Sequence, residues 1–338
     1  MKPTDFARNL ANFLSKYLPG ERGMSKHTVW SYKFAFVLFI LYLKQQKRVS
    51  ANKIELRHLT KENIIGFLDW LESERKCSIA TRNVRLAAIH SFMSFLQYQH
   101  PETIDKWQGI LAIKVKRAKK KVINYLSIDG IKLLLEQPII STLKGRRDLA
   151  MLALMYDCAA RVQEIIDLTP HSIRFDKPYT IKIVGKGNKT RIVPLMEQEI
   201  VHVKRYMSDN NLLEAHSRMD PLFFNNHKEQ LTRAGVNNIL KKYTIKARRL
   251  RPDLIPDKIS CHSLRHSKAM HLLQAGVNLI YIRDFLGHES VLTTELYARV
   301  DSKQKREATE KAYVGIIKKE IPAWIENDNL LEWLKNFK

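Results

Sequence analysis

The sequence predicts a mostly α-helical fold with a small β-sheet, divided into two parts. Apolar residues recur at helical spacing through residues 4–100, and again in several segments after residue 125. One strand–turn–strand pattern, "YTIKIVGKGNKTRIVPL" (179–195), interrupts the second group of helices. Between the two groups, "KVKRAKKK" (114–121) holds six basic residues in eight, which is typical of an exposed connection.

The composition indicates a globular protein with a polyanionic partner. Hydrophobic residues make up 45% of the 338 residues, too many for a disordered chain, and no apolar run is long enough to span a membrane. The formal net charge is +24, and nucleic acid is the commonest polyanion inside a cell. An anionic membrane surface is the alternative, but no basic amphipathic helix stands out, so no membrane partner is expected. Three widely spaced cysteines form no disulfide or zinc pattern, so a cytoplasmic location is expected.

Four helices are expected in the first hundred residues. They cover residues 4–18, 25–46, 61–75 and 79–98. Pro19 and Gly20 are expected to end the first helix, whereas Thr60 and Ser78 are suitable N-caps for the third and fourth. Residues 1–111 should therefore form a small all-helical domain.

Residues 112–124 form a basic linker. It contains Lys116, Arg117, Lys119, Lys120 and Lys121. One interpretation is a solvated connection between two domains. The other is a connection that also contacts phosphate groups, which suits so basic a chain.

The second part is expected to be helical with one β-hairpin. Helices are expected at residues 128–136 and 146–159, then from Arg161, Glu197, Thr232, His262 and Asn278. Behind Pro322, the segment "EIPAWIENDNLLEWLKNFK" (320–338) is expected to form a short amphipathic helix. It carries more apolar surface than a free tail should expose.

Several polar side chains stand where a hydrophobic core would not place them. Arg161 directly follows an apolar helix, and Glu164 lies one turn later; the ordinary interpretation is a weak surface ion pair. Lys186 lies between two glycines at the hairpin tip. A plain tight turn explains the glycines, but a lysine there could also reach a bound ligand and give up a proton.

The segment "CHSLRHSKAMH" (261–271) combines histidines with an arginine. His262 and Arg265 are three residues apart and share one helix face. His262 and His266 are four apart, a spacing that could hold a metal, but the other ligands of such a motif are missing. His266 and His271 are therefore expected to be structural, and no metal site is expected.

The segment "FLGHESVLTTELYARV" (285–300) supplies the last candidates. Gly287 is expected to end a helix, His288 to begin the turn, and Tyr297 to lie on the next helix. A tyrosine at helical spacing is usually a half-buried core residue. Together with the arginines, lysine and histidines, however, it completes an inventory for phosphoryl transfer on a diester without a metal. Arginines hold phosphate oxygens, histidine and lysine move protons, and tyrosine can be the nucleophile.

Four segments of the sequence resemble the tyrosine recombinases, or phage-type integrases. The matching strings are "ARVQEI", "VGKGNKTRIVPL", "HSLRH" and "LGHESVLTTELYARV", in the family's order across Tyr125 to Val300. The helical stretch before them resembles the family's core-binding, SAM-like domain. The resemblance implies a DNA-binding domain at residues 1–111, the linker at 112–124, an α+β catalytic domain at 125–315 and a tail helix at 316–338.

The resemblance implies a full catalytic set. Six positions match the family's catalytic residues: Arg161, Lys186, His262, Arg265, His288 and Tyr297. By the resemblance, Lys186 is the general acid for the 5′ oxygen, and Tyr297 forms a 3′-phosphotyrosyl link. His262 is a general base or a phosphate donor, and His288 donates to the scissile phosphate. Glu164 would support the set by orienting the first arginine or a neighbouring histidine.

The resemblance also implies a DNA substrate, an oligomeric state and protein partners. The substrate would be double-stranded DNA with inverted-repeat sites, exchanged through a Holliday junction by a homotetramer without metal, ATP or other cofactor. The tail helix would dock on a neighbouring protomer, and accessory or directionality proteins are conceivable partners. Arg82 and Arg85 join the linker cations as candidates for DNA contacts. The family often has glycine where this chain has Ala159, and we expect little effect from that change.

Several alternatives remain open at the level of sequence. A mobile-element integrase or transposase is the preferred role, because of the long tail and the high charge, and a chromosome or plasmid dimer resolvase of the Xer type is the alternative. A type IB topoisomerase would share the chemistry but relax supercoils. A non-catalytic DNA-binding protein of the same fold would have no need of the six residues. A metal-dependent nuclease would require a carboxylate cluster that the sequence does not show.

Overall fold

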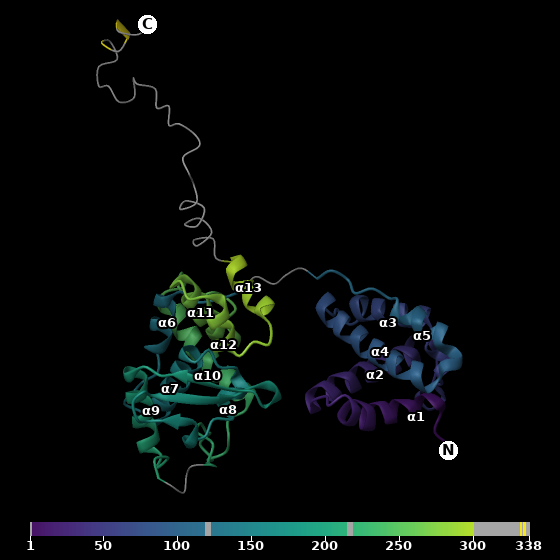
Figure 1. Ribbon diagram of the computed structural model, residues 1–338, viewed down its shortest axis with the longest axis horizontal. Coiled ribbons are helices and arrows are strands. Elements are labelled where there is room, and N and C mark those ends of the chain that lie inside the picture. Colours follow the sequence, from purple (N-terminus) through teal and green to yellow (C-terminus); the bar gives the residue numbers. More distant parts are fainter. Residues whose placement is uncertain (1, 119–122, 215–218, 301–331, 333, 336–338) are drawn as a thin grey trace. The chain divides into compact units, whose positions relative to one another are not determined.

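The computed structural model describes residues 2–118, 123–214, 219–300, 332 and 334–335, without the side chains of Lys186 and residues 298–300. The chain folds into two compact units, Met1–Lys121 and Val122–Lys338 (Figure 1). Both are helical, and the second contains the only sheet in the described ranges, so the predicted fold class is confirmed. Within those ranges no helix is long and apolar enough to cross a bilayer.

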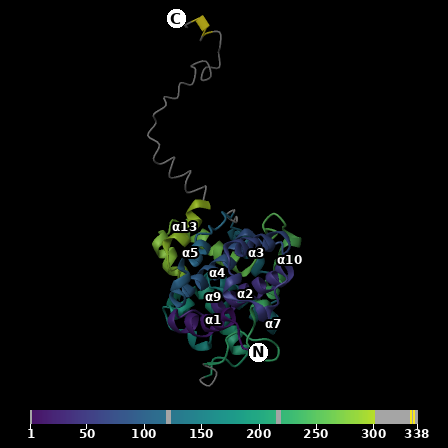
Figure 2. The ribbon, with the colours of Figure 1, turned by 90° about the vertical axis from the view of Figure 1, so that its right-hand side faces the viewer.

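The first unit contains the four predicted helices and a fifth. Their bounds are α1 Asp5–Asn12, α2 Lys26–Lys47, α3 Lys61–Ser73, α4 Ile79–Gln99 and α5 Ile104–Leu111. The side chains of Thr60 and Ser78 accept hydrogen bonds from the first turns of α3 and α4, as an N-cap does. Helix α4 packs against α2, α3 and α5 at the centre of the unit (Figures 1 and 2).

The predicted break at Pro19 and Gly20 is wrong. After α1 the chain continues as a π-helix, η1 (Phe13–Glu21), with Pro19 inside it. Proline removes one backbone hydrogen bond from a helix. Phe13 and Leu18 on this segment are fully buried in an aromatic core, and that burial stabilises the segment despite the missing bond.

The second unit packs helices around a three-stranded antiparallel sheet. Its helices are α6 Ile128–Leu135, α7 Leu143–Asp157, α8 Val162–Ile166, α9 Glu197–Asp209, α10 Arg233–Leu250, α11 Cys261–Gln274, α12 Leu279–Leu286 and α13 Val291–Val300. The strands are β1 Ile173–Arg174, β2 Thr180–Val184 and β3 Thr190–Pro194, in the order β1-β2-β3. The predicted hairpin is β2–β3, with Ile183 opposite Arg191; the two-residue β1 was not predicted.

Alternation along the hairpin determines which side chains face the core. Ile181 and Ile183 on β2 and Val193 on β3 are buried in the main core of the unit with α7 and α10. Arg191 lies opposite Ile183. A second, smaller core contains Met270 of α11, Ile282 of α12 and Tyr297 of α13. Helices α11, α12 and α13 pack on one another. This packing places α13, which carries Tyr297, against α11, which carries the "HSLRH" segment.

Glu199 on α9 is a buried carboxyl group whose two oxygens have no hydrogen-bond partner among the described residues. Burial, and then the charge of Asp157, raise its pKa from 4.5 to about 8, while Lys268 opposes the shift. The folded protein therefore holds a proton that the unfolded chain releases above pH 4.5.

The free energy of unfolding should consequently fall as the pH rises from about 4.5 to about 8, by at most about 1.4 kcal/mol per pH unit. We expect Glu199→Gln to melt at a higher temperature than wild type at pH 8.5 and at nearly the same temperature at pH 5. Differential scanning fluorimetry at both pH values checks this. Equal melting temperatures at pH 8.5 would show that the carboxyl group is not held neutral.

Candidate active site

The turn between α7 and α8 positions Arg161. Helix α7 ends at Asp157, and Ala159 then adopts a left-handed conformation with φ of 46°. This reversal makes Arg161 the N-cap residue of α8. The Arg161 side chain is only about one-third exposed, at 32%.

Ala159 stands in a conformation that glycine adopts more easily. A left-handed alanine costs about 1–2 kcal/mol. Glycine would relieve that cost but would add about 0.5–1 kcal/mol of chain entropy, and would lose a buried methyl group worth about 0.8 kcal/mol. These contributions nearly cancel. We therefore expect Ala159→Gly to change the free energy of unfolding by less than about 1 kcal/mol, measured by urea denaturation; a larger change would contradict this account of the turn.

Glu164 connects two arginines. One carboxylate oxygen, Oε1, accepts from Arg161 Nη1 at 2.6 Å, and the other, Oε2, accepts from Arg191 Nη2 at 2.7 Å and from the Arg161 amide at 2.9 Å. Burial alone would raise the pKa of Glu164, but these bonds and the charge of Arg191 lower it. The carboxylate therefore stays ionised and fixes both guanidinium groups. Among the described residues, Glu164 makes no hydrogen bond or ion pair with a histidine.

Arg265 lies on α11, and its guanidinium is buried. Its Nη1 donates to the Ala159 carbonyl at 2.7 Å, and its Nη2 donates to the Leu286 carbonyl at 2.5 Å. Burial and the charge of Arg161 lower the pKa of Arg265 to about 10, so it remains charged at neutral pH. Arg161 Nη2 points to the next carbonyl in the chain, that of Gly287, at 3.4 Å. The end of α12 thus brings together two arginines that are far apart in the sequence.

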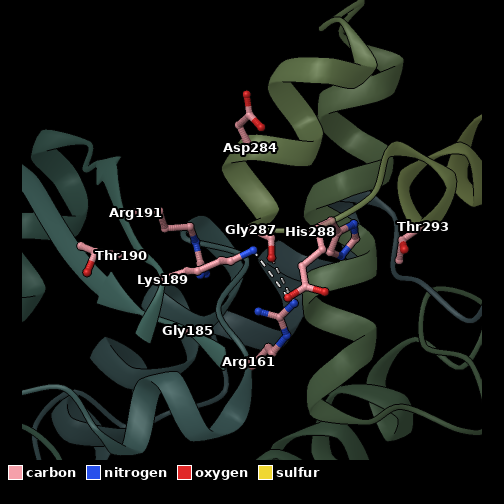
Figure 3. A pocket seen from close by; sticks show the side chains of 10 residues that line it. Arg161, Gly185, Lys189, Thr190, Arg191, Asp284, Gly287, His288 and Thr293 are labelled. Carbon is pink, nitrogen blue, oxygen red and sulfur yellow. Dashed lines mark hydrogen bonds and ion pairs between the residues drawn. The ribbon is translucent and has the colours of Figure 1, made fainter. Parts of the chain in front are cut away.

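A pocket of about 490 Å³ lies between the hairpin and the start of the α12–α13 loop (Figure 3). Arg191 and Lys189 line it from β3 and the hairpin tip, and Arg161 and His288 line it from the other elements. At the mouth, Lys189 Nζ and the carboxylate of Glu289 form an exposed ion pair of 3.5 Å. The surplus of positive charge and N–H donors suits an anion such as phosphate.

His288 follows the glycine that ends α12. Gly287 has φ of 63°, a left-handed conformation that turns the chain into the pocket. His288 Nδ1 lies 3.0 Å from Oγ1 of the buried Thr294, which fixes the ring. Burial, and then the charges of Arg265 and Arg161, lower the pKa of His288 to about 4, so the ring is neutral at pH 7.

His262 begins the same helix as Arg265, and its side chain is exposed. Partial desolvation, followed by the charges of Arg265 and Arg161, lowers its pKa. Within the part of the chain that the structure describes, its ring nitrogens have no hydrogen-bond partner. His262 is therefore free to contact a ligand near the two arginines.

Tyr297 is buried, with 2% of its surface exposed, and it packs in the small core with Met270 and Ile282. Its hydroxyl oxygen lies 2.8 Å from Nδ1 of His266, which was expected to be only structural. Burial raises the pKa of Tyr297, and the charges of Arg265 and Arg161 act in the opposite direction. Tyr297 does not line the pocket described above, so its hydroxyl must become accessible before it can react with a ligand there.

Six of the seven predicted catalytic and supporting residues are brought together, and Lys186 stands apart. Arg161, Glu164, Arg265, His288, His262 and Tyr297 come together around the end of α12. The backbone of Lys186 lies in the hairpin turn η6 (Lys186–Asn188), and its side chain lies outside the described part. In the described ranges, no three His, Cys, Asp or Glu side chains converge as metal ligands would.

The candidate DNA contacts of the first unit differ in their exposure and in their polar partners. Arg82 is 5% exposed, and its Nε lies 3.0 Å from Oε1 of Glu72, so its contact with DNA stays a prediction. Lys116 is exposed but pairs with the same carboxylate at 2.8 Å. Arg85 donates to the Ser31 carbonyl and lies over the Phe34 ring. Arg117 is exposed, whereas Lys119, Lys120 and Lys121 lie outside the described residues, as does nearly all of the expected tail helix (316–338).

Sequence reasoning missed three residues of the site. Arg191 is the second partner of Glu164, His266 contacts Tyr297, and Thr294 contacts His288. The alternation of β3 was a signal for Arg191, because it places this charged residue on the same strand face as the buried Val193, where it needs a partner. For Thr294, the pair "TT" beside the predicted nucleophile carried no distinguishing signal.

Both units match models of known protein families. Residues 124–304 match the model of the phage integrase family, and residues 11–100 match that of the phage integrase N-terminal SAM-like domain. A putative integrase/recombinase, y4rC, of Sinorhizobium fredii is 32% identical over 99% of both chains. The tyrosine recombinase XerD of Oceanobacillus iheyensis is 34% identical over 84% of this chain and 91% of its own length.

Solved structures agree on the fold. The XerH site-specific recombinase, in a pre-cleavage complex with its difH substrate, superposes with a TM-score of 0.66 at 23% identity, covering 89% of this chain and 84% of that one. The Tn1549 transposon integrase, in complex with transposon right end DNA, gives a TM-score of 0.69 at 12% identity, covering 90% and 98%. At these identities the likeness shows a shared fold.

Proposed function

This chain belongs to the phage integrase family and is a tyrosine recombinase, and from that premise we propose that it cuts and rejoins DNA through a covalent link to Tyr297. One observation carries the proposal. Arg161 and Arg265 are directed to the carbonyls of consecutive residues, Gly287 and Leu286, so two guanidinium groups flank one small region beside the pocket. A phosphodiester is the ligand that such a pair of forked donors fits best.

The arginines would bind the two non-bridging oxygens of the scissile phosphate. Arg265 uses two of its five N–H groups on carbonyls and Arg161 is held by Glu164, so both keep donors for a ligand. His288 and the exposed His262 would add hydrogen bonds from the two sides. Preorganised donors of this kind stabilise the extra negative charge of the transition state.

Tyr297 would be the nucleophile. Its oxygen attacks phosphorus, a 3′-phosphotyrosine forms, and the bond to the 5′ oxygen breaks. Lys186, at the hairpin tip, would give a proton to the departing 5′ oxygen, as its position in the matching motif implies. A 5′-hydroxyl of a partner strand then reverses the reaction, so the free energy of the diester is retained and neither ATP nor a metal is needed.

Strand exchange on two duplexes requires several active sites. We therefore include in the proposal a homotetramer acting on paired inverted-repeat sites through a Holliday junction, with the segment at residues 316–338 docking on a neighbouring protomer. The first unit would bind the duplex beside the cleavage point, with exposed Arg117 as a phosphate contact.

For the biological role we propose the integrase or transposase of a mobile element, with an accessory or directionality protein as a further partner. The y4rC relative, a putative integrase/recombinase that spans the whole chain, supports this role. Dimer resolution is the second candidate, because the XerD relative has comparable identity, 34%.

Covalent capture tests the proposal. The chain is expressed in a bacterial cell that carries its native flanking DNA, the cells are lysed in SDS with a chelator present, and protein-linked DNA ends are sequenced. Adducts at a few defined sequences are expected. Scattered adducts would instead indicate a topoisomerase, and no adducts from a protein that retards the same DNA in a gel would contradict catalysis.

A further inference from the structure

His266 is the one described residue whose side chain is hydrogen-bonded to the proposed nucleophile. Its Nδ1 lies 2.8 Å from the Tyr297 hydroxyl oxygen, and the ring centroids are 5.6 Å apart at an angle of 57°. The two residues come from α11 and α13, which pack directly on each other. This contact joins the reacting oxygen to an imidazole that lies next to Arg265 in the chain.

The chemistry of the contact follows from the state of the ring. Burial, and then the charges of His262 and Arg265, lower the pKa of His266 to about 4, so the imidazole is neutral at pH 7. A neutral imidazole has one nitrogen with a free lone pair, and Nδ1 can present that lone pair to the phenol. The phenol needs such an acceptor, because burial raises its own pKa.

His262 is less well placed for this task. It lies one turn earlier on α11, with its ring centroid 6.2 Å from that of His266. No hydrogen bond between His262 and Tyr297 is found in the described ranges. The side chain of His262 is exposed, which suits contact with DNA, whereas the half-buried His266 is the ring that touches the phenol.

We propose that His266 is the proton acceptor for Tyr297, a role that rests on the proposed function above. As Tyr297 Oη forms its bond to phosphorus, the phenolic proton moves to His266 Nδ1. The bond from phosphorus to the 5′ oxygen breaks at the same time, and Lys186 protonates that oxygen. In the rejoining step, the 5′-hydroxyl gives its proton to Lys186 and attacks phosphorus, the bond from phosphorus to Tyr297 Oη breaks, and His266 returns its proton to Tyr297.

Substrate binding would prepare His266 for this step. The charged and titratable groups that face it are His262 and Arg265 on its own helix and Tyr297 on α13. A phosphodiester anion bound by Arg265 would offset the positive charge that now disfavours the imidazolium. His266 would therefore become a better base only when DNA occupies the site.

The test distinguishes a His266 that accepts the proton of Tyr297 from a His266 that only positions the phenol by a hydrogen bond. His266→Asn keeps an oxygen that can accept a hydrogen bond from the phenol, but an amide cannot take up its proton. The matched control is His271→Asn: His271 lies on the same helix, and its Nδ1 is 2.8 Å from the hydroxyl of Tyr156. The rate of covalent adduct formation is measured in a single turnover on a nicked oligonucleotide that carries the captured site.

We expect His266→Asn to slow adduct formation about 10²-fold at pH 7, the low end of typical acid–base contributions, with DNA affinity unchanged. Its rate should rise steadily with pH as hydroxide replaces the base, and His271→Asn should react like wild type. A DNA with sulfur in place of the bridging 5′ oxygen should restore the rate of Lys186→Ala, because a thiolate leaves without a proton, but not that of His266→Asn.

Two results would overturn the assignment. If wild type forms adducts and His266→Asn forms them within about threefold of its rate, His266 does not accept the proton. If His266→Asn and His271→Asn are slowed equally, the effect is one of packing. Failure of wild type itself to form an adduct at Tyr297 would refute the proposed function, which is a separate outcome.

Discussion

Tyr297→Phe is expected to abolish covalent capture of DNA while leaving folding and DNA binding intact. The substitution removes only the hydroxyl group, and the ring remains in the small core with Met270 and Ile282. It leaves Nδ1 of His266 without its partner, which should cost about 1–3 kcal/mol of stability at most. The loss of the nucleophile should lower the adduct yield by at least about 10³-fold.

The measurement is adduct formation on the captured site, alongside thermal melting and gel retardation of the same DNA. Tyr281→Phe is a suitable control, because Tyr281 is 70% exposed on the neighbouring helix α12. It should behave as wild type in all three assays. Adducts that persist in Tyr297→Phe would assign the nucleophile to another residue.

Arg265→Ala is expected to affect both stability and cleavage. The carbonyls of Ala159 and Leu286 would lose their buried donors, at about 1–3 kcal/mol each. The scissile phosphate would lose a preorganised guanidinium group. Adduct formation by the folded fraction of the protein should therefore be about 10²-fold to 10³-fold slower. Chemical denaturation gives the first effect, and single-turnover adduct formation gives the second.

Arg147 offers a matched control for that experiment. It is also buried, at 7% exposure, and its Nη1 donates to the Phe224 carbonyl, but it lies in the main core with Asp148. Arg147→Ala should lose comparable stability without a specific loss of adduct formation at a temperature where it is folded. An equal kinetic effect in both variants would mean that Arg265 acts through the fold alone.

Local signals explain why so many helix bounds could be predicted. An N-cap residue is recognised from its own first turn, because its side chain accepts a hydrogen bond from an amide only two or three residues later. Four residues do this: Thr60, Ser78, Thr232 and Asn278. Gly287 is likewise a local signal, since a left-handed residue ends a helix. The break expected at Pro19 was wrong because core burial of its neighbours outweighs the local preference.

Contacts across the fold explain what the sequence did not reveal. Arg191 meets Glu164 across 27 residues, and His266 meets Tyr297 across 31. Both separations are far longer than one helical turn or the two-residue repeat of a strand. Hydrophobic patterns along a helix or strand therefore cannot reveal these contacts. The ion pair between Arg82 and Glu72 in the first unit likewise joins residues ten positions apart, which the sequence did not reveal.

The covalent bond between protein and DNA tests the central claim most directly. The SDS-trapped adduct is digested with nuclease and trypsin, and the peptide that retains nucleotide mass is sequenced by mass spectrometry. Cleavage after Arg283 and Arg299 releases residues 284–299, "DFLGHESVLTTELYAR", which contain a single tyrosine. We predict nucleotide mass on Tyr297 of this peptide. Nucleotide mass on any other residue, or cleaved DNA ends with no attached peptide, would contradict it.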